Sequence, residues 1–79
     1  MSNAEQISEF LVDEVGVNAP LAHGDDLLAS DQLDSQGIME LVAFLEEGFA
    51  IEVGDEDLVP DNFRSVDAIT AFVARKQGG

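Results

Sequence analysis

Residues 34–49 read DSQGIMELVAFLEEGF, and their apolar side chains recur at the spacing of one helix face. The residues of this stripe are Ile38, Leu41, Val42, Leu45 and Phe49. Apolar residues at i, i+3, i+4, i+7 and i+11 are typical of an amphipathic helix that buries one side. We therefore predict a helix that begins at Asp34-Ser35, ends near Gly48 and packs its stripe into a core.

The N-terminal segment predicts another helix, from about Ala4 to Val15. Its apolar residues at helical spacing are Ile7, Phe10, Leu11 and Val15. Two residue pairs suit a capping box at its start, Ser2 with Glu5 and Asn3 with Gln6. A capping box stabilises a helix start because two side chains accept hydrogen bonds from unpaired backbone N–H groups. Gly16 is the expected end of this helix.

A long loop should follow, from Gly16 to Asp34. Pro20, Gly24 and several aspartates interrupt any regular pattern in it. The leucines expected to pin this loop to the core are Leu21, Leu27, Leu28 and Leu33. A loop of this length in a small domain is often functional.

The segment after the long helix alternates like a strand at Phe49, Ile51 and Val53. We find no second strand for it to pair with, and a lone strand cannot satisfy its backbone groups. The prediction is therefore an extended loop, followed by a single helical turn at residues 55–58 before Pro60.

Ser65 is expected to cap a last helix. Its inward-facing residues are Val66, Ile69, Phe72 and Val73. Arg75 and Lys76 near its end complement the helix dipole, and Gly78 and Gly79 are expected to form a frayed tail. The predicted fold is an all-α four-helix bundle with three longer helices, one short helix and a long loop between the first two helices.

Length and composition restrict the architecture further. The 79 residues suit a single domain over residues 1–79, with an ordered core from about residue 4 to 76. The sequence has no cysteine, so apolar packing must supply the stability, and 46% of the residues are hydrophobic. No apolar run reaches the ~20 residues of a membrane span, and no basic segment precedes a hydrophobic one at the N-terminus. We expect a cytoplasmic protein, and a monomer.

Charge restricts the partners. Seventeen acidic residues face three basic ones, and the formal net charge is −14. Such a charge argues against nucleic acids and anionic membranes, and it favours partners with basic surfaces. The alternative interpretation is that the acidity only provides solubility.

A helical wheel of residues 35–49 separates the faces of the long helix. Opposite the apolar stripe lie Gln36, Glu40, Ala43 and Glu47. Ser35, Met39 and Glu46 share one flank. Neither Asp34 nor Ser35 is followed three residues later by Glu or Gln, so no capping box closes this helix start and it is expected to be open.

Leu33-Asp34-Ser35, followed by Gly37-Ile38-Met39-Glu40-Leu41-Val42, resembles the phosphopantetheine attachment site of acyl carrier proteins. The order of the predicted helices matches that family from about Ala4 to Lys76. The resemblance implies that a 4′-phosphopantetheine arm is attached to Ser35. A phosphopantetheinyl transferase would install the arm from coenzyme A, and its terminal thiol would carry acyl or aminoacyl groups as thioesters between enzymes. It also implies a protein that is not an enzyme and has no catalytic residues.

The resemblance also implies roles for the residues near Ser35. Asp34 would help to position Ser35 for the transferase and its magnesium ion, or it would cap the helix, or both. The residues expected to contact partners are Gln36, Met39, Glu40, Ala43, Glu46 and Glu47. The glutamates would dock onto basic patches of a loading ligase and of downstream acyl-processing enzymes; the alternative is a solvated helix face.

Two positions depart from the family pattern. Gln36 replaces a residue that is usually apolar, often Leu. Gly37 puts a poor helix former into the first turn, at a cost of ~1 kcal/mol against Ala. Gln36, together with the stretch Asn62-Phe63-Arg64-Ser65-Val66, favours a carrier of a specialised pathway over one of primary fatty-acid synthesis, according to the resemblance.

Other classes of function were weighed. A hydrolase is excluded because His23 is the sole histidine, and neither a second candidate base nor a G-x-S-x-G motif is present; a surface or loop-packing role is expected for His23. A calcium-binding module could draw on Asp25, Asp26, Asp31 and the run 55–57, but none of these fits the EF-hand spacing, so no metal site is expected. An acidic adaptor of the same fold that never receives the arm remains an alternative.

Overall fold

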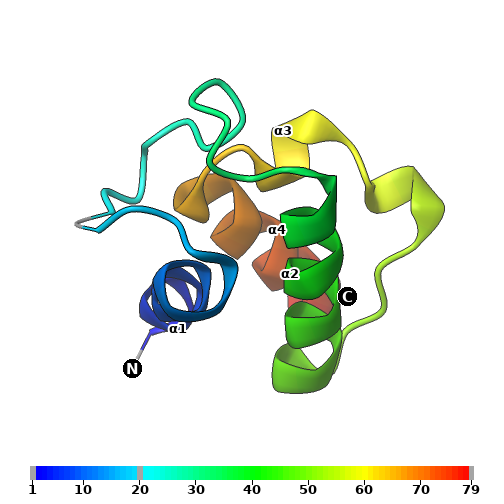
Figure 1. Cartoon of the computed structure of the whole chain (residues 1–79). Coiled ribbons are helices and arrows are strands. Elements are labelled where there is room, and N and C mark those ends of the chain that lie inside the picture. The colour runs from blue at the N-terminus through cyan, green and yellow to red at the C-terminus, as the bar shows by residue number, and fades with distance from the viewer. Residues whose placement is uncertain (1, 20, 79) are drawn as a thin grey trace.

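The computed structural model describes residues 2–19 and 21–78, and all regular elements in these ranges are helices (Figure 1). In chain order they are α1 (Asn3–Phe10), the π-helical turn η1 (Leu11–Val15), α2 (Ser35–Phe49), the 3₁₀ turn η2 (Asp55–Asp57), α3 (Pro60–Phe63) and α4 (Val66–Gly78). The α-helical fold class with three longer helices and one short one is confirmed. Pro20 and Gly79, which entered the predictions for the loop and the tail, lie outside the described residues.

The first helical segment begins and ends where the sequence indicated, but its last turn is not α-helical. Of the two candidate capping boxes, Ser2 with Glu5 forms: the Glu5 N–H donates to Ser2 Oγ at 3.2 Å, and the Ser2 N–H donates to Glu5 Oε1 at 3.4 Å. The predicted extent up to Val15 is confirmed, but the last five residues form the π-helical turn η1 rather than a continuation of the α-helix. Gly16 ends it in the left-handed region, with φ of +93°, which glycine adopts without strain.

The leucines of the loop from Gly16 to Asp34 attach it to the core, as predicted. Leu27 and Leu33 are buried, and Leu21 and Leu28 pack against the core. Two backbone hydrogen bonds join the loop to the C-terminal region: Leu27 N–H to Arg64 O at 2.6 Å, and Asp67 N–H to His23 O at 2.9 Å. The loop therefore has a defined path over the end of the bundle (Figure 1).

Helix α4 contacts each of the other α-helices, as Figure 1 shows by its place behind and between them. Ser65 caps it as predicted, since Ser65 Oγ accepts a hydrogen bond from the Ala68 N–H at 3.1 Å. Fully buried side chains of the core come from every part of the chain except the segment between α2 and α3, from which the partly buried Ile51 and Val53 pack against it. Its buried hydrophobic residues are Ile7, Leu11, Val17, Leu27, Leu33, Leu41, Leu45, Phe49, Phe63, Val66, Ile69, Phe72 and Val73.

Two predictions for the C-terminal half need correction. The helical turn at residues 55–58 is present as the 3₁₀ turn η2, but a separate helix, α3, begins at Pro60. Proline is favourable at the first position of a helix because its missing N–H would be unpaired there anyway, so Pro60 starts a helix rather than ending one. Gly78 is not frayed, because α4 continues through it. The extended loop after α2 is confirmed, with no strand among the described residues.

Candidate functional site

Ser35 is the first residue of α2, and its side chain is exposed. Within the described residues its hydroxyl makes no hydrogen bond. Two of the other serines differ: Ser30 Oγ donates to Asp26 O at 2.9 Å, and Ser65 is buried and accepts the cap bond from the Ala68 N–H. The Ser35 hydroxyl is thus exposed to solvent and accessible from outside the molecule.

Asp34 caps α2 directly. Its Oδ1 accepts a hydrogen bond from the Gly37 N–H at 2.8 Å, which confirms the cap interpretation of this residue. The expectation of a fully open helix start is therefore wrong in part, because a carboxylate cap at Asp34 satisfies one donor without a capping box. The N–H groups of Ser35 and Gln36 find no acceptor among the described residues. Unpaired N–H groups at the positive end of a helix dipole suit a phosphate.

Gly37 is buried, and its lack of a side chain has a packing reason. A Cβ built on it would lie 3.0 Å from Leu33 Cδ1, 3.0 Å from Val15 Cγ1 and 3.4 Å from Asp34 Oδ1. The end of η1 and the end of the loop therefore pack directly onto the first turn of α2. The sequence showed only the helix-propensity cost of this glycine, since the close approach depends on the π-helical turn that brings Val15 there.

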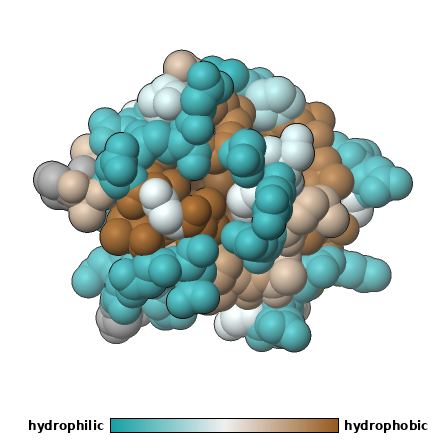
Figure 2. Space-filling model, viewed as in Figure 1, coloured by the Kyte–Doolittle hydropathy of each residue, from teal (hydrophilic) through white to brown (hydrophobic). Residues whose placement is uncertain are grey.

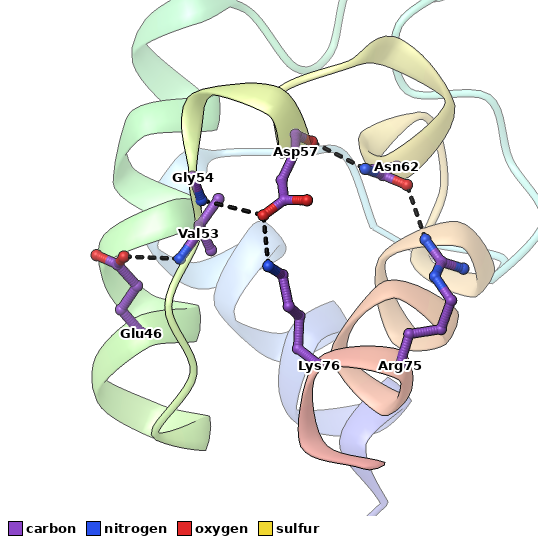
Figure 3. A network of polar contacts seen from close by, with 7 residues as sticks. All are labelled: Glu46, Val53, Gly54, Asp57, Asn62, Arg75 and Lys76. Carbon is purple, nitrogen blue, oxygen red and sulfur yellow. Dashed lines mark hydrogen bonds and ion pairs between the residues drawn. The ribbon is translucent and has the colours of Figure 1, made fainter. Parts of the chain in front are cut away.

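The outer face of α2 carries the predicted contact residues. Gln36, Glu40, Ala43 and Glu47 are exposed, and Met39 is 61% exposed beside them. Glu46 differs, because it is half-buried and its Oε2 accepts a hydrogen bond from the Val53 N–H at 3.0 Å (Figure 3). Figure 2 shows mainly hydrophilic surface on this view, with hydrophobic surface between the polar side chains. Glu46 thus anchors the loop after α2. The other five predicted contact residues do not share this structural role.

Two hollows border α2 near Ser35. One hollow, of about 250 Å³, is polar and is lined by Gln36 and Glu40 from α2 and by Glu14 from η1, among others. The other, of about 170 Å³, is apolar and is lined by Leu28, Ile38, Leu58, Val59, Pro60 and Phe63. Neither hollow was predicted. The adjacent apolar residues Leu58 and Val59, which are 40% and 43% exposed, were the sequence signal that could have indicated the second one.

The structure also bears on the other classes of site. Among residues 2–19 and 21–78 no group of three or more His, Cys, Asp or Glu side chains is placed to hold a metal ion. In the same ranges no helix has the length and apolar character needed to cross a membrane. His23 lies at the surface and contributes its backbone carbonyl to the packing of the loop, as noted above.

Known proteins resemble this chain over nearly its whole length, although no family model matches it. The acyl carrier protein of Solidesulfovibrio magneticus is 35% identical, covering 99% of this chain and 99% of its own. The acyl carrier protein of Nitratidesulfovibrio vulgaris is 35% identical, over 98% of this chain and 100% of its own. The acyl carrier protein of Akkermansia muciniphila is 33% identical, over 94% of this chain and 91% of its own. The solved structure of the apo form of KstB-PCP, a peptidyl carrier protein, has a TM-score of 0.78 and 31% identity over 98% of this chain and 88% of that one.

The helical fold, with an exposed serine at the start of its longest helix, is that of a small carrier protein. Carrier proteins are generally not catalytic themselves and work with transferases and acyl-processing enzymes. The chain belongs to the acyl carrier protein family.

Proposed function

We propose that this protein carries acyl or aminoacyl groups as thioesters on a 4′-phosphopantetheine arm attached to Ser35. The observation that carries the proposal is the exposed, unbonded hydroxyl of Ser35 at the start of α2 in a chain of this family. When bound, the arm supplies the terminal thiol that holds the cargo. Every chemical step on the cargo belongs to partner enzymes.

The residues around Ser35 fit a phosphodiester. The unpaired N–H groups of Ser35 and Gln36 can donate to phosphate oxygens, and the helix dipole favours the negative charge. Asp34 keeps the first turn closed through its bond to the Gly37 N–H. Only one of its oxygens is used in that bond, so the exposed carboxylate retains acceptor capacity toward the magnesium ion of the transferase.

The wider proposal follows from charge and size. The chain acts as one carrier domain over residues 1–79, as a monomer in the cytoplasm. Its partners are a phosphopantetheinyl transferase, a loading ligase for acyl or aminoacyl groups, and downstream enzymes with basic docking patches. Gln36 and the stretch 62–66 support a specialised pathway, whereas the acyl carrier protein relatives do not favour the calcium-binding and adaptor alternatives.

The test is incubation of the purified protein with coenzyme A and a broad-specificity phosphopantetheinyl transferase, followed by mass spectrometry of the intact protein. A carrier gains the mass of one arm covalently. An acidic adaptor or a calcium-binding module gains nothing. The absence of any mass gain, with a known carrier modified in parallel, would overturn the proposed function.

Charge on the outer face of α2 should govern the encounter with the transferase. Replacing Glu40 and Glu47 with Lys is expected to lower kcat/KM for arm transfer about 10-fold, because these exposed carboxylates attract basic partner surfaces. High salt should slow the unchanged protein in the same direction. The matched control is Glu9→Lys with Asp13→Lys, which makes the same change in net charge on the first helical segment. Equal losses in both double variants would show that only net charge matters.

Gln36 should contribute to the choice of pathway. An apolar residue at this exposed position suits an apolar pocket of a partner, whereas an amide buried there without a partner costs about 1–3 kcal/mol. Gln36→Leu is therefore expected to raise kcat/KM with primary fatty-acid synthesis enzymes by about fivefold or more, and to lower it with the native partner. Ala43→Leu, on the same face but two turns away, controls for added apolar surface. Unchanged values with both enzyme sets would refute a role of residue 36 in specificity.

A further inference from the structure

Two phenylalanine rings stack where the first helical segment meets α2. The ring centroids of Phe10 and Phe44 lie 4.2 Å apart, and the ring planes are 13° from parallel. Both side chains are half-buried, so part of each remains at the surface. Phe49, which is buried, meets the Phe44 ring edge-on at 5.9 Å and ties the pair to the core. The junction of α1 and α2 therefore has an aromatic floor that is partly open to solvent.

A hollow of about 260 Å³ opens over these rings, and we name it the seam hollow. Its lining residues are Gln6, Glu9, Phe10, Asp13, Glu14 and Phe44. The three carboxylates in this set are exposed, and none of them takes part in a hydrogen bond or ion pair among residues 2–19 and 21–78. Glu14 also lines the polar hollow beside Gln36 and Glu40. The seam hollow therefore combines apolar ring surface with a rim of unpaired negative charge.

The chain places no cation near this rim. All three basic side chains lie within residues 64–76. Their polar partners are Asp61, Asn62 and Asp57. Arg75 and Lys76 also lie over the Phe72 ring, 5.9 and 5.8 Å from its centroid. In the part of the chain that the structure describes, the rings of Phe10 and Phe44 have no such cation, so positive charge for the seam hollow must come from another molecule.

The chemistry of the seam hollow fits an arginine side chain. A guanidinium group is planar, stacks on aromatic rings, and has five N–H donors arranged to match carboxylates. A lysine ammonium is a compact and strongly hydrated charge, so it could pair with the rim but would gain less from the rings. An apolar group would remove water from the carboxylates without replacing their hydrogen bonds. Arginine is the occupant that uses both the floor and the rim.

The seam hollow faces away from the attachment site. Phe44 follows Ser35 by nine positions in α2, and at about 100° per residue this is a rotation of about 180° around the helix axis. Met39, which follows Ser35 by four positions, lies on the Ser35 flank. A protein bound at the seam hollow would therefore leave the flank that carries Ser35 and Met39 uncovered.

We propose that the seam hollow is a second docking surface, which binds an arginine side chain of a partner protein that does not itself act on the arm. The outer face of α2 and the seam hollow then serve different partners. For its consequence the inference rests on the proposed function: the seam partner holds the carrier while enzymes reach the arm from the Ser35 flank.

The first test titrates the unmodified, ¹⁵N-labelled protein with helical peptides at low salt. The peptides are identical except at two positions four residues apart, which hold Arg, Lys or uncharged citrulline. The Arg peptide is expected to cause saturable shifts of the amide signals of Phe10, Asp13 and Phe44, with a Kd about threefold or more below that of the Lys peptide. The citrulline peptide should cause none. Equal affinity of the Arg and Lys peptides, or shifts as large at residues 55–57, would overturn the proposal.

Two ring variants test the aromatic floor. Phe44→Leu and Phe10→Leu each keep an apolar side chain and remove one ring of the stacked pair, and thermal unfolding checks that the variant is folded. Either change is expected to abolish the preference for Arg over Lys, because the ammonium and the guanidinium then differ only in how they pair with the rim. A preference retained in a folded variant would overturn the role of the rings. If one variant does not fold, the other decides.

The rim is tested by neutral variants. Glu9→Gln with Asp13→Asn is expected to raise the Kd of the Arg peptide about fivefold, since exposed ion pairs contribute modestly. The matched control is Glu52→Gln with Glu56→Gln, which makes the same change in net charge on the loop after α2 and should raise the Kd by less than about twofold. Equal effects of the two double variants would show that the peptide responds only to net charge, and would overturn the site.

Arm transfer tests whether the seam partner is distinct from the transferase. Glu9→Gln with Asp13→Asn should keep kcat/KM for arm transfer within about twofold of the Glu52→Gln, Glu56→Gln control, because the two surfaces lie on opposite flanks of α2. A larger loss would overturn the separation of the two surfaces. Failure of the unchanged protein to receive an arm would instead refute the proposed function, and the peptide titration of the unmodified protein would still decide the seam hollow.

Discussion

Ser35→Ala is expected to abolish arm attachment completely while leaving the fold intact. Ser35 supplies the oxygen of the proposed phosphodiester, so Ala leaves no acceptor for the transferred group. Its hydroxyl makes no hydrogen bond among the described residues, and the cap of α2 is Asp34 rather than Ser35. The free energy of unfolding should therefore change by no more than about 0.5 kcal/mol. Intact-protein mass spectrometry and thermal unfolding provide the two readouts.

Asp34→Ala separates capping from attachment in the same assay. Loss of the bond to the Gly37 N–H should lower the free energy of unfolding by ~1 kcal/mol, and arm transfer should become slower without being abolished. Ser30→Ala, on the loop, should keep the full mass gain. Residual modification of the Ser35→Ala protein would contradict the assignment of the site.

Gly37→Val is expected to destabilise the protein by about 1–3 kcal/mol, as overpacking does in a filled interior. Even a Cβ would lie 3.0 Å from Leu33 Cδ1 and Val15 Cγ1, and a branched side chain must displace η1 or the loop from the start of α2. Denaturant unfolding would measure the loss. Arm transfer should also slow, because the displaced elements border Ser35.

Gly48→Ala is the control for this glycine effect. Gly48 is exposed near the end of α2, and a Cβ there would meet nothing closer than Phe44 Cε1 at 3.7 Å. The substitution should stabilise the protein by about 0.5–1 kcal/mol through helix propensity. If Gly37→Val also stabilised the protein, close packing of η1 on α2 would not explain the glycine at position 37.

Local sequence patterns predicted the features that depend on single elements. The apolar stripe of α2 predicted its extent to within a residue at each end, and the cap at Ser65 followed from one hydroxyl before an apolar run. The exposed positions of Gln36, Glu40, Ala43 and Glu47 follow from helical geometry once α2 is placed. These signals are strong because the residues involved lie within a few turns of one another.

Features that depend on tertiary contacts were missed. The π-helical turn at residues 11–15 changes the end of the first helix, and its apolar spacing does not differ from that of an α-helix. Lys76 was interpreted through the helix dipole, whereas it pairs with Asp57, nineteen positions earlier in the chain. Glu46 was placed on a partner surface, and its bond to the Val53 N–H depends on how the loop folds back on α2. No local pattern encodes such contacts.

The site of attachment in the unchanged protein is the most direct test of the account. After reaction with coenzyme A and the transferase, proteolysis and fragment mass spectrometry locate the modified residue. The account predicts one arm per chain, on the fragment containing Ser35, with Ser30 and Ser65 unmodified because the first is hydrogen-bonded and the second is buried. An arm on either of those serines, or on no residue, would contradict it.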